Sequence, residues 1–282
     1  MESKNTYCQY LESSGDDRGI ESLKIYLPVG EGFVNYNIVH SVMKSTNCDT
    51  WRLSVVYDCD GELTPMKTLT RSGAEWEMAL KIKCRPDFIG GYAHGDEVFE
   101  KIAVEIDGEE RELNDLSVLT DFKSLSFEVW SRGYDPDDSK TEALLHYKRI
   151  TFSKDGVKVE QRVEWLNDYE LANSYMAMMP PFKEFTDHYY TNSDKTKCPI
   201  VLGETVTRTA DVNALYLCGE GGFTFEMKVD KYLTDQNGKN TFIVTDNGGV
   251  PYNKMYFLLN HSGRVIRGEV FETITEYFIS RS

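Results

Sequence analysis

The sequence predicts an all-β protein, built as one large antiparallel β-sandwich with few helices. Two-residue turn signals recur along the chain, at Asp60-Gly61, Asp107-Gly108, Asp155-Gly156, Asn237-Gly238, Asn247-Gly248 and Ser262-Gly263. Asn or Asp before Gly supplies the positive φ angles that tight hairpins need. The stretches between these turns alternate apolar and polar residues, and few of them show a helical period.

The clearest element is a hairpin that turns at Asp155-Gly156. Its arms read "HYKRITFS" and "VKVEQRVEWL", and the second arm alternates over about nine residues in the manner of a strand with one wet face. We therefore expect one face to be buried and the other to be exposed. The buried set is Val157, Val159, Val163 and Trp165, and the exposed set is Lys158, Glu160 and Glu164.

Other stretches are less distinct. "GAEWEMALKIKC", residues 73–84, fits a short helix or a strand, and the Ile-Lys-Cys ending before a proline favours a strand. "NYNIVHSVMKST", residues 35–46, is ambiguous in the same way. The polar stretch 183–213 predicts a long loop, and the glycine-rich residues 219–223 predict a bulge or turn between strands.

Length and composition are consistent with a single domain. The chain has 282 residues, of which 40% are hydrophobic, and a β-sandwich of this length can form one unit. We expect residues 1–282 to make one sandwich, of supersandwich or jelly-roll type, with residues 1–22 as a possible small N-terminal extension.

The charge and the cysteines restrict the partners and the compartment. A formal net charge of -15 repels phosphate backbones and anionic lipids, so no nucleic-acid or membrane partner is expected. The six cysteines form no C-x-x-C pair, and the N-terminus has no apolar signal segment. We expect free thiols, synthesis in the cytoplasm, and an oligomeric state that the sequence leaves open, with a homo-oligomer as one possibility.

The stretch "IGGYAHGDEVFEKIAVEIDG", residues 89–108, holds the first candidate site. In the functional interpretation Tyr92 and His94 are catalytic, and Asp96 and Glu97 bind a ligand, because a carboxylate beside an imidazole builds a general base. In the alternative interpretation Asp96 and Glu97 cap turn amides, and His94 is an ordinary exposed histidine. The functional interpretation places residues 90–97 at an exposed rim or cleft.

Two further groups complete the candidate site. On a strand, His146 and Lys148 point to one face while Tyr147 and Arg149 point to the other, so His146 is a third catalytic candidate and Lys148 or Arg149 a cationic ligand contact. His188 is the fourth catalytic candidate. Tyr189 and Tyr190 are candidates for sugar stacking, or else surface tyrosines that pack on the sheet.

No cofactor is predicted. The histidines and acids show no metal signature such as H-E-x-x-H, and the sequence has no P-loop and no nucleophile elbow. The run "DPDD", residues 135–138, offers oxygen ligands for calcium, but it lacks the spacing of a calcium loop.

The segments "DFIGGYAHGDEVFEKIAVEIDG" and "HYKRITFSKDGVKVEQRVEWLNDYELANSYMAMMPPF" resemble a β-sandwich module of tail-associated proteins from phages that infect Gram-positive gut bacteria. The resemblance covers roughly residues 85–190. It implies a virion protein that is released by host lysis and that binds a glycan or other virion proteins. The general shape also resembles the supersandwich of sugar mutarotases and polysaccharide lyases, which implies polar catalytic side chains on the concave face of a sheet.

Three functions follow from these resemblances. The first is a non-catalytic module for carbohydrate recognition or virion structure. The second is a polysaccharide lyase or hydrolase that acts on cell-surface glycan, with His94 or Tyr92 as base and Lys148 or Arg149 neutralising a uronate carboxylate. The third is a cytosolic mutarotase-like sugar enzyme.

Overall fold

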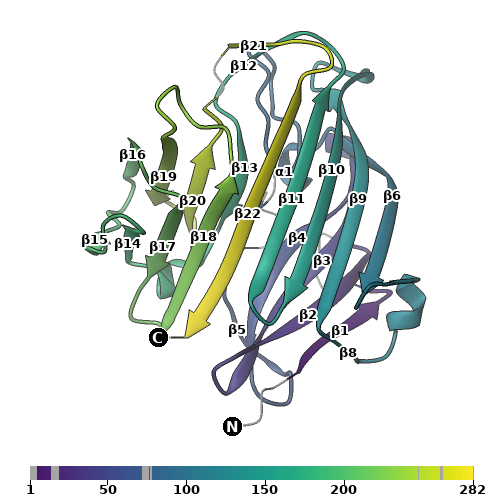
Figure 1. Cartoon of the computed structure of the whole chain (residues 1–282), viewed down its shortest axis with the longest axis vertical. Helices are drawn as coiled ribbons and strands as arrows, with labels where there is room; N and C mark the ends of the chain where they lie inside the picture. Colours follow the sequence, from purple (N-terminus) through teal and green to yellow (C-terminus); the bar gives the residue numbers. More distant parts are fainter. Residues whose placement is uncertain are drawn as a thin grey trace.

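A computed structural model describes residues 5–13, 19–71, 76, 78–246, 248–260 and 263–281. It confirms the all-β class (Figure 1). In this part of the chain the helical elements are one short α-helix and three 3-10 turns, α1 (Gly91–His94), η1 (Lys44–Thr46), η2 (Leu113–Leu116) and η3 (Lys183–Phe185). No helix among the described residues is long and apolar enough to cross a membrane.

Most strands belong to one large sheet. Its first half comprises β1 (Thr6–Leu11), β2 (Glu21–Val29), β3 (Gly32–Met43), β4 (Cys48–Cys59), β5 (Pro65–Thr68), β6 (Glu97–Ile106), β7 (Glu109–Arg111), β8 (Thr120–Phe122) and β9 (Ser124–Asp135). Its second half comprises β10 (Asp138–Ser153), β11 (Gly156–Trp165), β14 (His188–Thr191), β15 (Cys198–Pro199), β17 (Ala214–Cys218), β18 (Phe223–Lys231) and β22 (Val270–Arg281).

The strand order of this sheet is β15-β14-β17-β18-β22-β11-β10-β9-β6-β4-β3-β2-β1-β8, with β5 on β4 and β7 on β6. Neighbours are antiparallel except at β4 and β6, which form a short parallel pair at Cys48–Glu97 and Asp49–Val98. A four-stranded sheet runs β13 (Tyr175–Met179), β20 (Asn253–Leu258), β19 (Asn240–Asp246), β16 (Thr205–Ala210), and β12 (Tyr169–Leu171) pairs with β21 (Gly263–Val265).

The large sheet folds over itself, so that its first four strands lie behind β9, β10 and β11 (Figure 1). Aromatic contacts join β3 and β4 to the strands in front of them: Tyr36 of β3 packs on Phe152 of β10, and Trp51 of β4 packs on Phe127 of β9. The four-stranded sheet adds Met179, Phe242 and other side chains to the same core. The main core therefore fills the space between the layers, as a sandwich requires.

The hairpin prediction at Asp155-Gly156 is confirmed. Strands β10 and β11 pair from Ser153–Gly156 to Leu144–Trp165. Val157, Val159, Val163 and Trp165 are all at most 1% exposed. Lys158, Glu160 and Glu164 lie on the opposite face, where neighbouring strands leave them partly exposed.

The other turn signals have mixed outcomes. Asp107-Gly108 joins β6 to β7 with both residues at positive φ, as predicted for a tight hairpin. Asp60-Gly61 lies between β4 and β5, and Asn237-Gly238 lies between β18 and β19. Asn247 and Ser262, the first residues of the last two signals, lie outside the described residues.

Two sequence interpretations need correction. Residues 183–213 are not one long loop, because they contain η3, β14, β15 and β16. Residues 73–84 form no continuous strand: Ala79, Leu80 and Ile82 make only isolated bridges, and residues 73–75 and 77 lie outside the described residues. Both segments pack on tertiary neighbours, which local periodicity does not report.

The ambiguous and terminal stretches are also placed. Residues 35–43 are part of strand β3, and η1 follows directly. Strand β1 falls in the segment 1–22 considered as an N-terminal extension, and it pairs with β2 and β8 in the large sheet. All six cysteines are free thiols, and Cys8, Cys48, Cys59 and Cys218 are buried.

Candidate functional site

A polar cluster crosses the inner face of the large sheet, where strand alternation otherwise places apolar side chains. Glu97 on β6, Ser131 on β9 and His146 on β10 form its centre. The Ser131 hydroxyl donates to Glu97 Oε1 at 2.6 Å, and His146 Nδ1 lies 2.8 Å from the same oxygen. We call Glu97, Ser131, His146, Lys148 and Gln161 the inner-face cluster.

The cluster continues onto β11. His146 Nε2 lies 3.2 Å from Gln161 Oε1, and Gln161 Nε2 donates to the carbonyl of Met176 at 2.8 Å. The bond to Met176 fixes the orientation of the Gln161 amide, so its oxygen faces the imidazole. Both ring nitrogens of His146 therefore face side-chain oxygen atoms, one of Glu97 and one of Gln161.

All five side chains are polar, and they are almost completely buried. The exposed fraction is 1% for Glu97, 2% for His146 and Lys148, and 3% for Gln161 and Ser131. Burial alone would raise the pKa of Glu97, but the His146 hydrogen bond and the Lys148 charge outweigh it and hold that pKa at about 2. Glu97 is thus a carboxylate throughout the physiological pH range. Buried charges of this kind are costly, and they concentrate at functional sites.

The glycines at 90–95 explain how Glu97 reaches the interior. Gly90, Gly91 and Gly95 have φ of 117°, 69° and 80°, and Asp96 follows at 52°. These are left-handed values that glycine adopts without a Cβ penalty. A Cβ on Gly95 would lie 1.8 Å from the carbonyl oxygen of Thr46. The turn therefore packs backbone against backbone, and the strand that follows begins with Glu97 facing inward.

A cation and an aromatic ring adjoin the cluster from β4 and α1. Arg52 is fully buried, and its guanidinium lies 5.3 Å from the centre of the Tyr92 ring. Cys48 lies on the same face of β4 as Arg52. Burial is the main reason that its pKa rises to about 12, and the charges of Glu97, Arg52 and Lys148 act on it as well. Within residues 90–97 the three glycines and Glu97 are buried, whereas Tyr92, His94 and Asp96 are partly exposed, so the exposed rim stays a prediction.

His94, the first catalytic candidate from the sequence, is not part of the inner-face cluster. His94 Nδ1 is 2.6 Å from Asp87 Oδ1, and its ring packs on Phe88 at 4.7 Å. The expected neighbouring carboxylate is present, but it is Asp87 rather than Asp96 or Glu97. Asp96 is half-buried, and burial raises its pKa. The catalytic roles predicted for His94 and Tyr92 stay predictions.

Of Lys148, Arg149 and His188, only the first lies in the inner-face cluster. Lys148 lies with His146 on the inner face, as expected, whereas Arg149 lies on the outer face near Glu105 and Glu128, at 3.6 and 3.5 Å. His188 is partly exposed and paired with Asp187 at 2.7 Å. The structure therefore brings His146, Lys148 and Glu97 together, and it directs Arg149 and His188 elsewhere.

The two tyrosines have opposite environments. Tyr189 is 4% exposed and belongs to the main core, so it cannot stack on a ligand at the surface, and that expectation needs correction. Tyr190 points to the outer face, where its ring stacks on Tyr216 at 4.6 Å with an interplanar angle of 4°. The alternation of strand β14 separates the pair, since successive side chains point to opposite faces.

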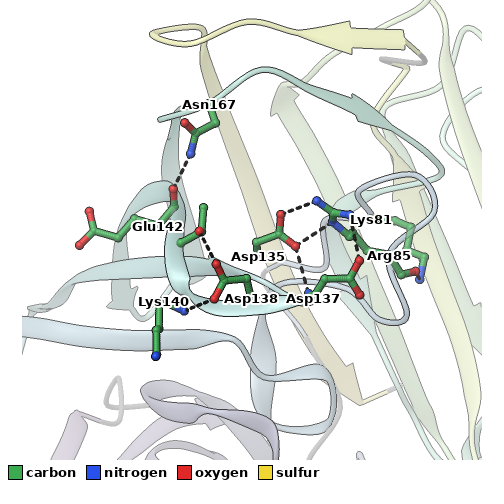
Figure 2. A network of polar contacts seen from close by, with 9 residues as sticks. Lys81, Arg85, Asp135, Asp137, Asp138, Lys140, Glu142 and Asn167 are labelled. Carbon is green, nitrogen blue, oxygen red and sulfur yellow. Dashed lines mark hydrogen bonds and ion pairs between the residues drawn. The ribbon is translucent and has the colours of Figure 1, made fainter.

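Acidic residues at the turn between β9 and β10 hold the segment before α1 (Figure 2). Arg85 contacts both oxygens of buried Asp135, at 2.7 and 2.8 Å, and also Asp137 at 2.8 Å. Asp138 accepts from the Lys140 backbone and from Thr141. The "DPDD" oxygens thus face a guanidinium and local donors, which does not suit calcium. In the described part of the chain, no three potential ligand side chains gather into a metal site.

Sequence reasoning missed Ser131, Gln161 and Arg52. A signal existed for Gln161, because it falls between Val159 and Val163 on the buried face of a strongly alternating strand. A polar residue at such a position must find buried partners, which makes it informative. Ser131 and Arg52 carry no comparable signal, since their strands were not assigned residue by residue.

Comparison with solved structures agrees with this architecture. The chain is similar to a galactose mutarotase-like protein from Clostridium acetobutylicum, with a TM-score of 0.53, 9% identity, and coverage of 99% of this chain and 100% of that one. It is also similar to the galactosidase domain of the alpha-galactosidase-sucrose kinase AgaSK, with a TM-score of 0.53, 10% identity and 92% coverage. The α-galactosidase AgaA from Geobacillus stearothermophilus gives 0.52, 10% and 92%.

The chain spans only 40% and 41% of the two galactosidase chains. No family model matches it, and no curated protein does. At these identities the likeness establishes the fold: the chain is a supersandwich β-protein of the architecture seen in those three structures. The resemblance to phage tail proteins receives no support from them.

Proposed function

We propose that the chain is a carbohydrate-active enzyme of mutarotase-like type, which interconverts the anomers of a sugar at the inner-face cluster. The observation that carries the proposal is the buried contact between Glu97 and His146. It places an ionised carboxylate beside an imidazole at the centre of the folded sheet. The shared fold adds support, since a mutarotase-like protein has the same architecture over its full length.

The chemistry of the pair favours this reaction over the alternatives. In anomer interconversion a base takes the proton of the anomeric hydroxyl, a carbonyl forms as the bond from the anomeric carbon to the ring oxygen breaks, and an acid protonates that oxygen. The carbonyl then turns over, and the same transfers in reverse close the ring to the other anomer. Glu97 acts as the base and His146 as the acid. Glu97 is ionised, so it can accept the hydroxyl proton, and His146 lies 2.8 Å away to serve the ring oxygen. Glycoside hydrolysis needs two carboxylates about 5–10 Å apart, and among the described residues Glu97 is the carboxylate that contacts His146.

Anomer exchange can be measured directly by exchange NMR on galactose and glucose. We expect the wild-type protein to accelerate the exchange, and Glu97→Gln and His146→Gln each to remove most of the acceleration. His40→Gln is the matched control, because His40 is also a buried histidine held by two carboxylates, Glu21 and Asp49, both at 2.7 Å. It packs on Trp51, on the face of β4 opposite to Arg52.

Each outcome of this experiment is informative if folding is verified by thermal melting. Ser131→Ala provides a milder change, since it removes one hydrogen bond to Glu97 and leaves both proton-transfer groups in place. No acceleration by a folded wild-type protein on either sugar would refute the proposal. Equal acceleration by Glu97→Gln would move the chemistry to another site.

Non-catalytic carbohydrate recognition is the second candidate function. The closure of the cluster counts against catalysis there, because every member is at most 3% exposed and each polar atom of Glu97, His146 and Gln161 described above already faces a protein partner. Catalysis at this place requires the covering side chains to move aside. Hydrogen exchange of the Gln161 side chain, faster in the presence of sugar, would favour the enzyme over the recognition module.

A further inference from the structure

A hollow of about 550 Å³ lies between the ends of the four-stranded sheet and the connection from β18 to β19. This volume is in the range of small-molecule sites, about 300–1,000 Å³. Its polar lining consists of six side chains, Asn173, Asp235, Gln236, Asn237, Thr241 and Asn260. We call it the amide pocket. None of the inner-face cluster lines it.

Part of this lining is held rigidly. Asn260 Nδ2 donates to the carbonyl of Lys239 at 2.9 Å, and its Oδ1 accepts from the Thr241 hydroxyl at 2.7 Å. Asp235 Oδ1 accepts from the backbone amides of Asn237 and Lys239, at 2.9 and 2.7 Å. The Asp235 bonds hold the 235–239 turn in its own shape, and the Asn260 bonds tie its end to the segment that follows β20. The wall of the pocket is therefore preformed, which lowers the entropy cost of binding.

Two amides face the pocket from its exposed side. Asn173 and Gln236 line the pocket and are exposed to solvent, whereas the Asn237 side chain hydrogen-bonds Asp235. A side-chain amide offers two N–H donors and one carbonyl acceptor. Neighbouring hydroxyl groups of a sugar each donate and accept, so a wall of amides complements them. Ala172 and Leu258, both partly exposed, contribute apolar surface, which suits the C–H face of a sugar ring.

Charge selects among saccharides. Among the described residues that line the pocket, Asp235 is the charged one, and its Oδ1 accepts from backbone amides. That described lining includes no Lys or Arg side chain, and the chain as a whole carries a net charge of -15. A uronate or a sugar phosphate would meet repulsion without a compensating cation. We propose that the amide pocket is a binding site for a neutral saccharide, separate from the inner-face cluster.

The test is an NMR titration of the nitrogen-15-labelled protein with maltose, cellobiose and lactose, and with digalacturonate as the charged comparator. A neutral disaccharide should shift the side-chain amide resonances of Asn173 and Gln236 with a dissociation constant on the order of 1 mM. Digalacturonate should not. The double variant Asn173→Ala/Gln236→Ala should weaken binding about tenfold, the value of one or two hydrogen bonds.

Asn114→Ala is the matched control, since it removes an exposed amide from η2, which packs beside β1 in another part of the molecule. It should bind like the wild type. The proposal is overturned if none of the neutral disaccharides shifts these resonances at about 10 mM, or if the double variant binds as tightly as the control.

The experiments distinguish failure of the amide-pocket proposal from failure of the proposed anomer exchange at the inner-face cluster. Glu97→Gln should leave the titration unchanged, because Glu97 does not line the pocket. If Glu97→Gln instead abolishes the shifts, the saccharide occupies the inner-face cluster and the amide pocket is not its site. If binding is intact but anomer exchange is absent in the wild type, only the proposed enzyme activity is refuted.

Discussion

His146 on β10 and Glu97 on β6 meet across the intervening strand β9, with 2.8 Å between Nδ1 and Oε1. They are 49 residues apart in the chain, and Ser131 of β9 bonds to the same carboxylate oxygen. This contact depends on three strands in register, and it places opposite charges where the core would otherwise be apolar. Four predictions follow from it and from the segments that hold it.

The first concerns acid stability. The pKa of Glu97 is lowered to about 2, so its contribution to stability is present above its ordinary value near 4.5 and is lost as pH falls toward 2. The advantage of the wild type over Glu97→Gln in free energy of unfolding should therefore be larger at pH 6 than at pH 3. Urea denaturation at the two pH values measures it, and an advantage that grows on acidification would contradict the assigned direction.

The second concerns the Arg85 clamp. Asp135 is 3% exposed, so Arg85→Ala leaves a buried carboxylate without its main partner and should cost about 2–3 kcal/mol. Asp137→Asn removes only a partly exposed contact of the same guanidinium and should cost less than about 1 kcal/mol. Chemical denaturation compares the two variants. Hydrogen exchange should also quicken across residues 80–96 in Arg85→Ala, and equal costs for both variants would mean that the clamp is not structural.

The third concerns two glycines with nearly equal φ. Gly95→Ala places a Cβ 1.8 Å from the Thr46 carbonyl, whereas a Cβ at Gly108 meets nothing within 4 Å. Gly108→Ala should cost about 1 kcal/mol from its positive φ alone. Gly95→Ala adds a backbone clash and should cost several times more, about 3 kcal/mol or above. Melting curves of the two variants test this, and similar shifts would show that the 90–97 turn can relax.

The fourth concerns thiol reactivity. Burial raises the pKa of Cys8 and Cys48 to about 12 and that of Cys59 to about 11, whereas Cys84 is exposed. Because the thiolate is the reactive form, a disulfide reagent at pH 8 should modify Cys84 first in the native protein. Cys84→Ser should remove the fast phase. Denaturation without reductant should release all six thiols, and a lower count would reveal a disulfide.

The candidate site was only partly predictable. The alternation around His146 is local, so its sequence correctly put His146 and Lys148 on one face and Arg149 on the other. The partner of His146, in contrast, is not determined by residues near it in the sequence. Residues 90–97 contain both His94 and Glu97, and nothing in that stretch shows which of them faces inward. The left-handed turn at Gly95 and Asp96, packed on Thr46, decides that it is Glu97.

Local physics in the sequence determined the β class, the hairpin at Asp155-Gly156 and the buried side of β11, because turn chemistry and side-chain alternation act over a few residues. Tertiary structure alone decided the rest. It paired β4 with β6, buried Tyr189 while leaving Tyr190 on the outer face, and joined Glu97 to His146. Those outcomes depend on which distant strands become neighbours when the large sheet folds over itself. The residue pattern of a single strand does not specify those neighbours.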